Sequence, residues 1–317
     1  MASTHSNPVK EYYDKISSGE IVTSRKVIAA YAHIVSNMHN ESCPYHYDED
    51  KANHAISFVE KFCKQSKGKA GGTPIKLELW QRAFISVIFG MVDEQGFRQY
   101  REAIMIVGRK NGKSTLASAI GLYLLTKDGE PGPEIYSVAS KKDQARVIWD
   151  ESVKMIHKSP ALKKRCKTLV SVIKCEYNDG TFRALAADSN SLDGLNVHGA
   201  LLDEVHAWKD KNLYDVVVDG ESARQQPLTL ITTTAGTVRE SIYDLKYDEC
   251  AKIIAGYDDG KYVDERVFAT VYELDNSNEL YTESAWKKAN PGLGTIKSLD
   301  TLRAKVHKAK ADDRLEK

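Results

Sequence analysis

Hydrophobic residues recur along the first part of this chain with the spacing of amphipathic helices. Residues 25–38 and 51–65 place apolar side chains every three or four positions among polar ones, which predicts helices with one buried face. Residues 66–76 contain three glycines and a proline that interrupt this pattern. Residues 77–93 then resume an apolar helix. We therefore expect residues 1–70 to form a helical segment that packs against the rest of the chain.

From about residue 102 the pattern changes to short apolar runs separated by amphipathic stretches. This alternation is typical of an α/β sheet whose strands are joined by helical crossovers. The expected strands are 102–107, 134–139, 199–203 and 228–234, together with a hairpin-like pair, 167–177 and 181–188. We place the α/β core at residues 71–260 and a small helical linker region, which includes the turn "NPGLG", at residues 261–317.

Composition and charge narrow the possible partners. The chain has 317 residues, 42% of them hydrophobic, and its 45 basic and 44 acidic side chains leave a formal charge of +1. Proteins that bind DNA mainly by neutralising phosphates usually carry a basic excess, so a nucleic-acid contact must come from a local patch or from assembled subunits. The five cysteines form no C-x-x-C pair, and neither a targeting pattern nor a membrane-length apolar run occurs. Reduced thiols in a cytosol are therefore expected.

The segment "VGRKNGKSTL", residues 107–116, is close to a phosphate-binding loop. The P-loop pattern G-x-x-x-x-G-K-[ST] requires glycine at position 107, where this chain has Val107 followed by Gly108. An expected strand precedes the segment and an expected helix follows it, as a phosphate cradle requires. Backbone N–H groups of residues 111–114 would hold the β-phosphate, Lys113 would reach the β- and γ-oxygens, and Ser114 would bind Mg²⁺. The alternative is a Gly-Lys-Ser turn that opens an ordinary helix.

Two further strand ends carry candidate chemistry. The apolar run "GALLD" ends in Asp203 and Glu204; in P-loop machines the first acid holds the hydration shell of the metal and the second polarises the attacking water. The run "LTLITTT" ends in Thr232, Thr233 and Thr234, whose hydroxyls could sense the γ-phosphate from the strand beside the acids. Taken alone, two acids are also typical of any buried strand that ends at solvent. Three threonines can equally reflect the ordinary preference of threonine for strands. The combination with a P-loop is more specific than either, and it predicts that the loop and the acid pair end neighbouring strands of a single sheet.

Five segments together resemble the large terminase subunits of tailed bacteriophages, the ATPases that drive DNA into preformed capsids. They are "VGRKNGKSTL", "EIYSVASKKDQA", "SLDGLNVHGALLDEVHAW", "ARQQPLTLITTTAG" and "ANPGLG". The resemblance covers nearly the whole chain, and the displaced first glycine and the arginine inside the loop are features of that family. It implies a P-loop fold of the ASCE type, with helices flanking a mostly parallel sheet. It also implies Mg²⁺-dependent ATP hydrolysis that drives double-stranded viral DNA into a procapsid, in the host cell cytoplasm. The implied partners are DNA, a portal protein, a small terminase subunit and further copies of the chain in a ring, expected to be a pentamer.

The resemblance also assigns roles to residues. Arg109 would act in cis on the phosphates and Glu204 would be the catalytic acid, while Ser114 and Asp203 would hold the metal. Trp80 and Gln81 stand where the family has its adenine-side motif, and Thr232, Thr233 and Thr234 where it has its coupling motif. The full set of implied nucleotide-binding residues is Gly108, Arg109, Lys110, Asn111, Gly112, Lys113, Ser114, Thr115, Trp80 and Gln81.

Packaging ATPases work as rings, so the resemblance also implies an arginine finger from a neighbouring subunit. The candidates are Arg146, Arg183 and Arg224, each of which could equally be a solvated surface arginine. DNA contacts could come from the basic cluster "KKRCK", residues 163–167, or from the lysines of the last helix. A charge run is more often a solvated face.

Two other functions are compatible with parts of the sequence. "DEVH", residues 203–206, matches the DExH pattern of helicases, but no arginine-rich helicase motif follows it and the remaining length is short for a second lobe. A degenerate P-loop scaffold without turnover is the other alternative. The intact Lys113, Ser114, Asp203 and Glu204 argue against it.

Large terminases also carry a nuclease domain of ribonuclease H-like fold, which binds divalent metals through acidic residues. After "NPGLG" this chain has only about 25 residues, which predict one charged helix and no strand with a metal-binding aspartate. We therefore expect the purified chain to leave supercoiled plasmid intact with Mg²⁺ or Mn²⁺, as checked by gel electrophoresis. Metal-dependent nicking that follows the chain through purification would contradict this expectation.

Overall fold

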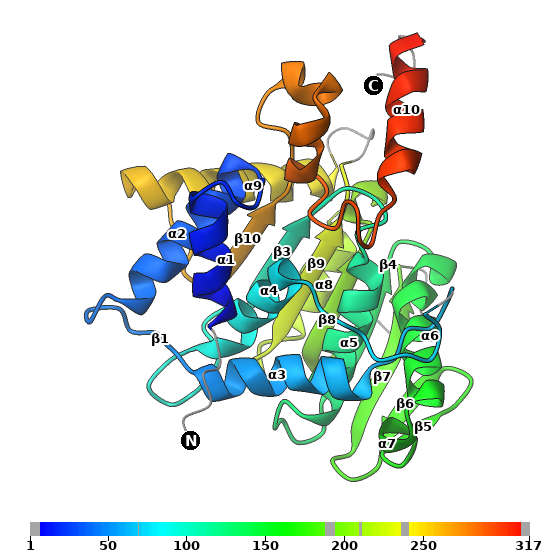
Figure 1. Ribbon diagram of the computed structural model, residues 1–317. Helices are drawn as coiled ribbons and strands as arrows, with labels where there is room; N and C mark the ends of the chain where they lie inside the picture. Colours follow the sequence, from blue (N-terminus) through cyan, green and yellow to red (C-terminus); the bar gives the residue numbers. More distant parts are fainter. Residues whose placement is uncertain (1–6, 69, 188–193, 209–210, 236–240, 312–317) are drawn as a thin grey trace, which may run out of the picture.

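The computed structural model describes residues 7–68, 70–187, 194–208, 211–235 and 241–311, and an eight-stranded sheet forms its centre (Figure 1). Six neighbouring strands run parallel, and two short antiparallel strands extend the sheet at one side. In spatial order the strands are β10 (Val267–Val271), β3 (Glu102–Ile106), β9 (Leu228–Thr233), β8 (Val197–Asp203), β4 (Glu134–Ala139), β7 (Gly180–Ala186), β6 (Val172–Cys175) and β5 (Cys166–Thr168). The predicted α/β class with a mostly parallel sheet is confirmed.

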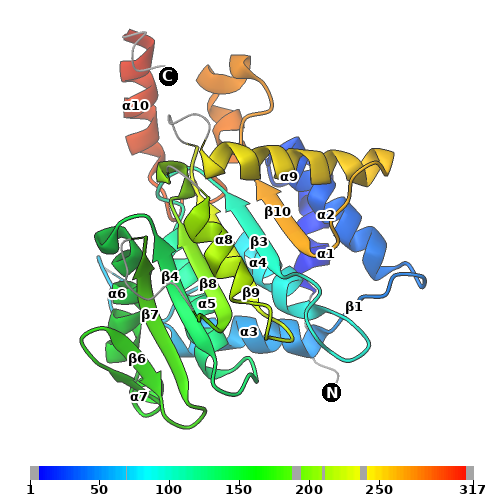
Figure 2. The same cartoon turned by 180° about the vertical axis from the view of Figure 1, so that it is seen from behind.

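Helices cover both faces of this sheet. One face packs against α1 (Pro8–Ser17), α2 (Arg25–Met38), α3 (Glu49–Phe62), α4 (Leu79–Gly90), α5 (Lys113–Thr126), α6 (Lys142–Lys158) and the short α7 (Pro160–Lys163). The other face packs against α8 (Asn212–Asp219) and α9 (Ile242–Asp259), seen in front in Figure 2. Alternation along β3 supplies both cores: Ala103 and Met105 face the first, and Ile104 and Ile106 the second.

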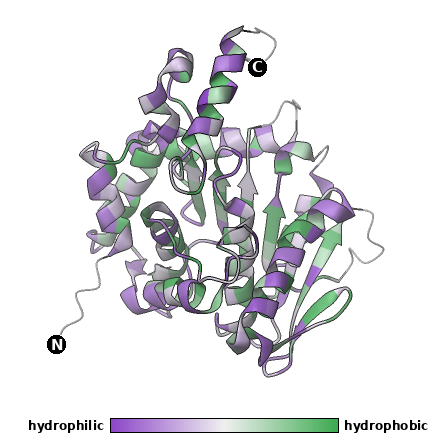
Figure 3. Cartoon of the chain, turned by 45° about the vertical axis from the view of Figure 1, so that its right-hand side comes forward, coloured by the Kyte–Doolittle hydropathy of each residue, from purple (hydrophilic) through white to green (hydrophobic). Residues whose placement is uncertain are grey.

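Coverage of both faces explains the composition of the strands. Every residue of β8, β9 and β10 is buried, as expected for parallel strands enclosed on two sides. Figure 3 shows the central strands as largely hydrophobic and the surrounding helices as mixed. The last helix, α10 (Leu299–Ala311), projects away from the sheet (Figure 1). None of the described helices is long and apolar enough to cross a membrane.

The structure corrects the boundary drawn at residue 260. Strand β10 lies in the segment assigned to a linker, yet it pairs with β3 along its whole length, from Val267 opposite Glu102 to Val271 opposite Ile106. These five residues are not among the strands expected from the sequence, and the pairing with β3 shows that they belong to the sheet. The structure also adds a two-stranded ribbon, β1 (His46–Tyr47) with β2 (Met91–Val92), that the sequence did not predict.

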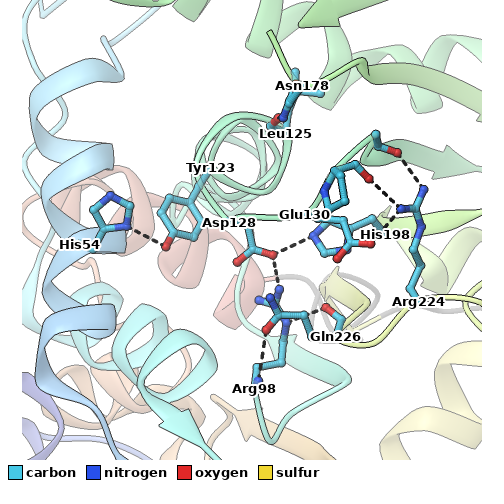
Figure 4. A network of polar contacts seen from close by, with 12 residues as sticks. His54, Arg98, Tyr123, Leu125, Asp128, Glu130, Asn178, His198, Arg224 and Gln226 are labelled. Atoms are coloured by element: carbon cyan, nitrogen blue, oxygen red, sulfur yellow. Dashed lines mark hydrogen bonds and ion pairs between the residues drawn. The ribbon is translucent and has the colours of Figure 1, made fainter. Parts of the chain in front are cut away.

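Buried charges join the loops at the amino-terminal edge of the parallel strands (Figure 4). Asp128 forms an ion pair with Arg98 and lies 2.7 Å from Nε2 of His198. Arg224 pairs with Glu130 at 2.8 Å and also donates to the carbonyls of residues 132 and 196. These contacts connect the segments that enter β4, β8 and β9 on the side of the sheet away from the phosphate loop.

Glu221, at this same edge, gives the fold a testable pH dependence. Burial raises its pKa from 4.5 to about 7, and nearby Glu102 adds to the effect. The folded state therefore binds more protons than the unfolded state between these values, so stability falls as the pH rises through this window. We expect Glu221→Gln to increase the free energy of unfolding by on the order of 1 kcal/mol at pH 8, and by much less at pH 5.

Urea unfolding at the two pH values measures this difference. Glu176→Gln, at an exposed carboxylate paired with Lys167, is the control and should shift stability little at either pH. An equal effect of Glu221→Gln at pH 5 and pH 8 would show that the carboxyl does not titrate as described.

Candidate active site

The phosphate loop connects β3 to α5 at the carboxyl edge of the sheet. Val107 continues β3, with its side chain 1% exposed and its N–H donating to the carbonyl of Thr233 at 3.0 Å. The position where the standard pattern has glycine is therefore still part of the sheet. The chain then turns through Lys110 (φ 67°) and Gly112 (φ 81°), both in the left-handed region, before α5 begins at Lys113. This turn presents the free N–H groups of the first turn of α5 to the outside of the sheet edge.

The acid pair lies directly opposite the start of α5. Asp203 ends β8, and its carboxylate accepts a hydrogen bond from Ser114 Oγ at 2.7 Å. Lys113 Nζ is 3.7 Å from Asp203 Oδ1 and in direct contact with Glu204 Oε1. Glu204 has φ 53°, a conformation that costs energy in a residue other than glycine. The four residues that the sequence assigned to phosphate, metal and catalysis thus meet at one place.

The prediction that the loop and the acid pair end neighbouring strands is wrong. Both strands belong to one sheet, but β9 lies between β3 and β8. Thr232 and Thr233 end this middle strand and Thr234 follows it, beside the acid-bearing strand as expected. Thr232 Oγ1 lies 3.2 Å from Asp203 Oδ1, and the Thr232 carbonyl accepts the N–H of Glu204 at 3.0 Å. The middle strand therefore contacts the loop on one side and the acids on the other.

His206 is a site residue that the sequence presented only as the last letter of a helicase-like pattern. Its Nδ1 lies 3.0 Å from Glu204 Oε2 and 3.2 Å from Thr233 Oγ1. Burial lowers the pKa of His206, and the positive charges of Arg109 and Lys113 lower it further, against the opposing effect of Glu204. A largely neutral imidazole consequently links the candidate catalytic acid to the middle strand. In the sequence, the position of His206 two residues after Glu204 is the one feature that could have indicated it as a site residue.

A hollow of about 120 Å³ lies beside the phosphate loop, between α5 and the segment that joins α3 to α4. Gln81 and Thr115 line it, and Gln81 is fixed at the start of α4 because its Oε1 accepts the N–H of Glu78 at 3.0 Å. Trp80, the other half of the expected adenine-side pair, is not among the lining residues. Its ring packs against Tyr272 and its Nε1 donates to Glu78 at 2.8 Å. Gln81 therefore contacts this hollow directly, while Trp80 supports the start of the helix.

The remaining candidates lie outside this cluster of side chains. Arg109 and Lys110 are exposed at the tip of the phosphate loop. Arg146, near the start of α6, pairs with Asp150 at 3.1 Å and lies over the ring of Trp149. Arg183 is exposed on β7. Arg224 is held within its own chain at the opposite edge of the sheet, as described above.

The oxygen donors at this site fit a magnesium ion. Ser114 and Asp203 supply a hydroxyl and a carboxylate 2.7 Å apart, and Mg²⁺ in nucleotide sites usually takes one or two such ligands together with phosphate and water oxygens. In the described residues there is no group of three or more His, Cys, Asp or Glu side chains placed to hold a metal. The hydroxyl of Ser114 and the carboxylate of Asp203 suit a metal that is held by protein and nucleotide together.

With this geometry established, comparison with known proteins identifies the family. The family model described as "Terminase large subunit, ATPase domain" matches residues 79–252, which are 174 of the 317 residues. The chain belongs to this family. The matched region of this terminase ATPase chain includes the phosphate loop, the acid pair and the threonine strand, and it leaves out β10 and all that follows.

Individual relatives agree with this assignment. The chain is 26% identical over 263 residues to the terminase large subunit of Enterobacteria phage HK97, covering 80% of this chain and 49% of that protein. It is 24% identical over 271 residues to that of Lactococcus phage p2, covering 82% and 48%. The crystal structure of the HK97 large terminase has the same fold, with a TM-score of 0.72 and 24% identity over 84% of this chain and 53% of that one. This terminase chain thus spans about half the length of the curated relatives it matches.

Proposed function

We propose that the chain hydrolyses ATP with Mg²⁺ and that this hydrolysis drives double-stranded viral DNA into a procapsid. The observation that carries the proposal is the convergence of Lys113, Ser114, Asp203 and Glu204 at one edge of the sheet, with the Ser114–Asp203 hydrogen bond and the Lys113–Glu204 contact joining loop and acids. These residues lie within the region that matches the terminase ATPase domain, which supports the proposal.

Each residue has a physical role in this proposal. Phosphoryl transfer depends mainly on positioning and on cations around the γ-phosphate, since charge spreads over its oxygens in the transition state. Lys113 supplies one cation from inside the site, and Arg109, exposed on the same loop, supplies a second. Ser114 and Asp203 would hold Mg²⁺, which neutralises charge on the phosphate oxygens when bound. Glu204 would orient the attacking water and accept its proton.

His206 and the threonines fit the proposed transmission of this reaction. Glu204 contacts His206, which contacts Thr233 on β9, and the carbonyl of that threonine accepts the N–H of Val107 at the start of the loop. The acid and the phosphate loop are therefore connected through one middle strand. Movement of Glu204 during hydrolysis would shift His206 and, through it, β9. This agrees with the coupling role that we assign to Thr232, Thr233 and Thr234.

The proposed partners follow from the packaging role. They are double-stranded DNA, a portal protein, a small terminase subunit and further copies of this chain in a ring, a pentamer by family analogy, all in the host cell cytoplasm. The basic cluster at residues 163–167 lies beside β5, the last strand at one edge of the sheet. Its Lys167 forms an exposed ion pair with Glu176. Contacts there would follow phosphate rather than base sequence and would weaken with salt.

Two substitutions test the proposed chemistry. Lys113→Ala removes a cation from the phosphates and is expected to weaken ATP binding roughly 10- to 100-fold. Glu204→Gln keeps the shape of the side chain but removes the proton acceptor, so binding is retained while kcat falls roughly 100-fold or more. Isothermal titration and steady-state phosphate release measure the two effects separately. Near-normal turnover by Glu204→Gln would remove Glu204 from its role.

The trans-acting arginine is tested by mixing variants. An alanine variant of the finger should bind ATP normally, lose most turnover, and regain activity when mixed with Lys113→Ala, because the mixed ring contains a complete site at some interfaces. We expect this behaviour for Arg146 or Arg183, whose side chains are at least partly accessible. Arg224→Ala should instead lower the melting temperature, because it removes the pairing with Glu130. Failure of complementation for all three arginines would reject a finger from this set.

A further inference from the structure

A turn from the carboxyl-terminal part of the chain lies on the phosphate loop. It covers residues 289–297, between a short 3-10 helix (Glu283–Lys288) and α10, and it passes over the carboxyl end of the strands in Figure 1. The turn contains the "NPGLG" segment and is outside the region matched by the family model. Nothing in the roles described so far uses it.

Three hydrogen bonds join the turn to the loop, and a fourth lies within the loop. Gly108 N donates to the carbonyl of Ala289 at 2.9 Å. The amide of Asn111 donates to Asn290 Oδ1 at 3.2 Å and to the carbonyl of Gly108 at 2.7 Å. Asn111 Oδ1 accepts the N–H of Gly292 at 3.1 Å. Asn111 is 0% exposed and Asn290 7% exposed, so neither amide faces solvent. Asn290 is held in addition by its own bond to the Trp286 carbonyl at 3.0 Å.

This contact also explains the displaced glycine of the loop. A Cβ atom at Gly108 would lie 2.4 Å from Asn290 Oδ1 and 2.8 Å from the carbonyl oxygen of Ala289. Any side chain at position 108 would push the turn away, whereas the backbone at Val107 belongs to the sheet and accommodates a buried side chain. The glycine therefore stands one position later than in the standard pattern because the turn approaches the loop there.

The same turn reaches the hollow beside the loop. Ile296 lines this hollow together with Gln81, Gly112 and Thr115, and its side chain is 41% exposed. Its Cγ2 would lie 3.6 Å from a Cβ placed on Gly112. An apolar side chain over the helix N-terminus is well suited to the flat face of a nucleotide base, with Gln81 supplying polar contacts at the edge.

We propose that this turn is a working part of the nucleotide site, in which Asn111 and Asn290 are positioning residues for the phosphate loop and Ile296 is a base-contacting residue. The proposal rests on the proposed ATP binding and adds residues to the same site. Asn111 anchors the loop through the Gly108 carbonyl and through Asn290 and Gly292 near the start of the turn. The N–H groups that face the phosphates are ordered as a result. A loop that is not anchored would lose affinity and catalytic alignment together.

The experiment compares ATP with inorganic tripolyphosphate in isothermal titration, and follows ATP turnover in parallel. Asn290→Ala and Asn111→Ala are expected to weaken both ligands roughly 10-fold, because they disturb the loop. Ile296→Ala is expected to weaken ATP roughly 5-fold and tripolyphosphate not at all, because only ATP has a base. Gly108→Ala, which removes no polar group, should reproduce the Asn290→Ala result by displacing the turn.

Asn178→Ala is the matched control. Its amide likewise bridges backbone groups, donating to the Leu125 carbonyl at 2.9 Å and accepting from Gly180 N at 3.2 Å, at the far end of α5. Asn178→Ala should lower the melting temperature about as much as Asn290→Ala does, but it should leave the affinity for both ligands unchanged. If Asn290→Ala and Gly108→Ala bind ATP and tripolyphosphate as the original chain does, the positioning role is wrong although ATP binding stands. If the original chain binds neither ligand, the proposed function falls and this inference with it.

Discussion

The arrangement of this site depends on the parallel pairing of β9 with both β3 and β8. Parallel strands in register bring their carboxyl ends to one edge, so the residues that follow three strands meet although they are far apart in sequence. The Ser114–Asp203 hydrogen bond joins segments separated by 89 positions. Burial on both faces makes this register costly to shift, because a slip by one residue would exchange the residues of the two cores.

Much of the core could be predicted from the sequence because its signals are local. The apolar runs that became β3, β4, β8 and β9 are each bounded by turn residues or by the first residues of a helix, and a phosphate loop is recognised from a few contiguous positions. The acid pair is similarly contiguous with its strand. The two motifs are informative together because a sheet brings consecutive strand ends to one edge.

The features that the sequence did not predict depend on contacts between distant segments. Strand β10 is defined by its pairing with β3, and the order of strands by the placement of β9 between the loop and the acids. The role of His206 depends on Thr233, 27 positions away. Trp80 and Gln81 are adjacent in sequence, but successive helical residues point in different directions, so only Gln81 lines the hollow. The contacts of "NPGLG" with the loop join positions 179 and 181 residues apart, so the sequence could show the segment as a signature but could not place it over the loop.

The close approach at Gly108 links two positions that are 182 residues apart. A side chain at 108 would collide both with the amide at 290 and with the backbone carbonyl of Ala289, so the whole turn would have to move. In related chains a side chain at this position is therefore expected together with a different course of the turn. A phosphate loop of the standard pattern grafted onto this scaffold would need a matching carboxyl-terminal turn from the same donor.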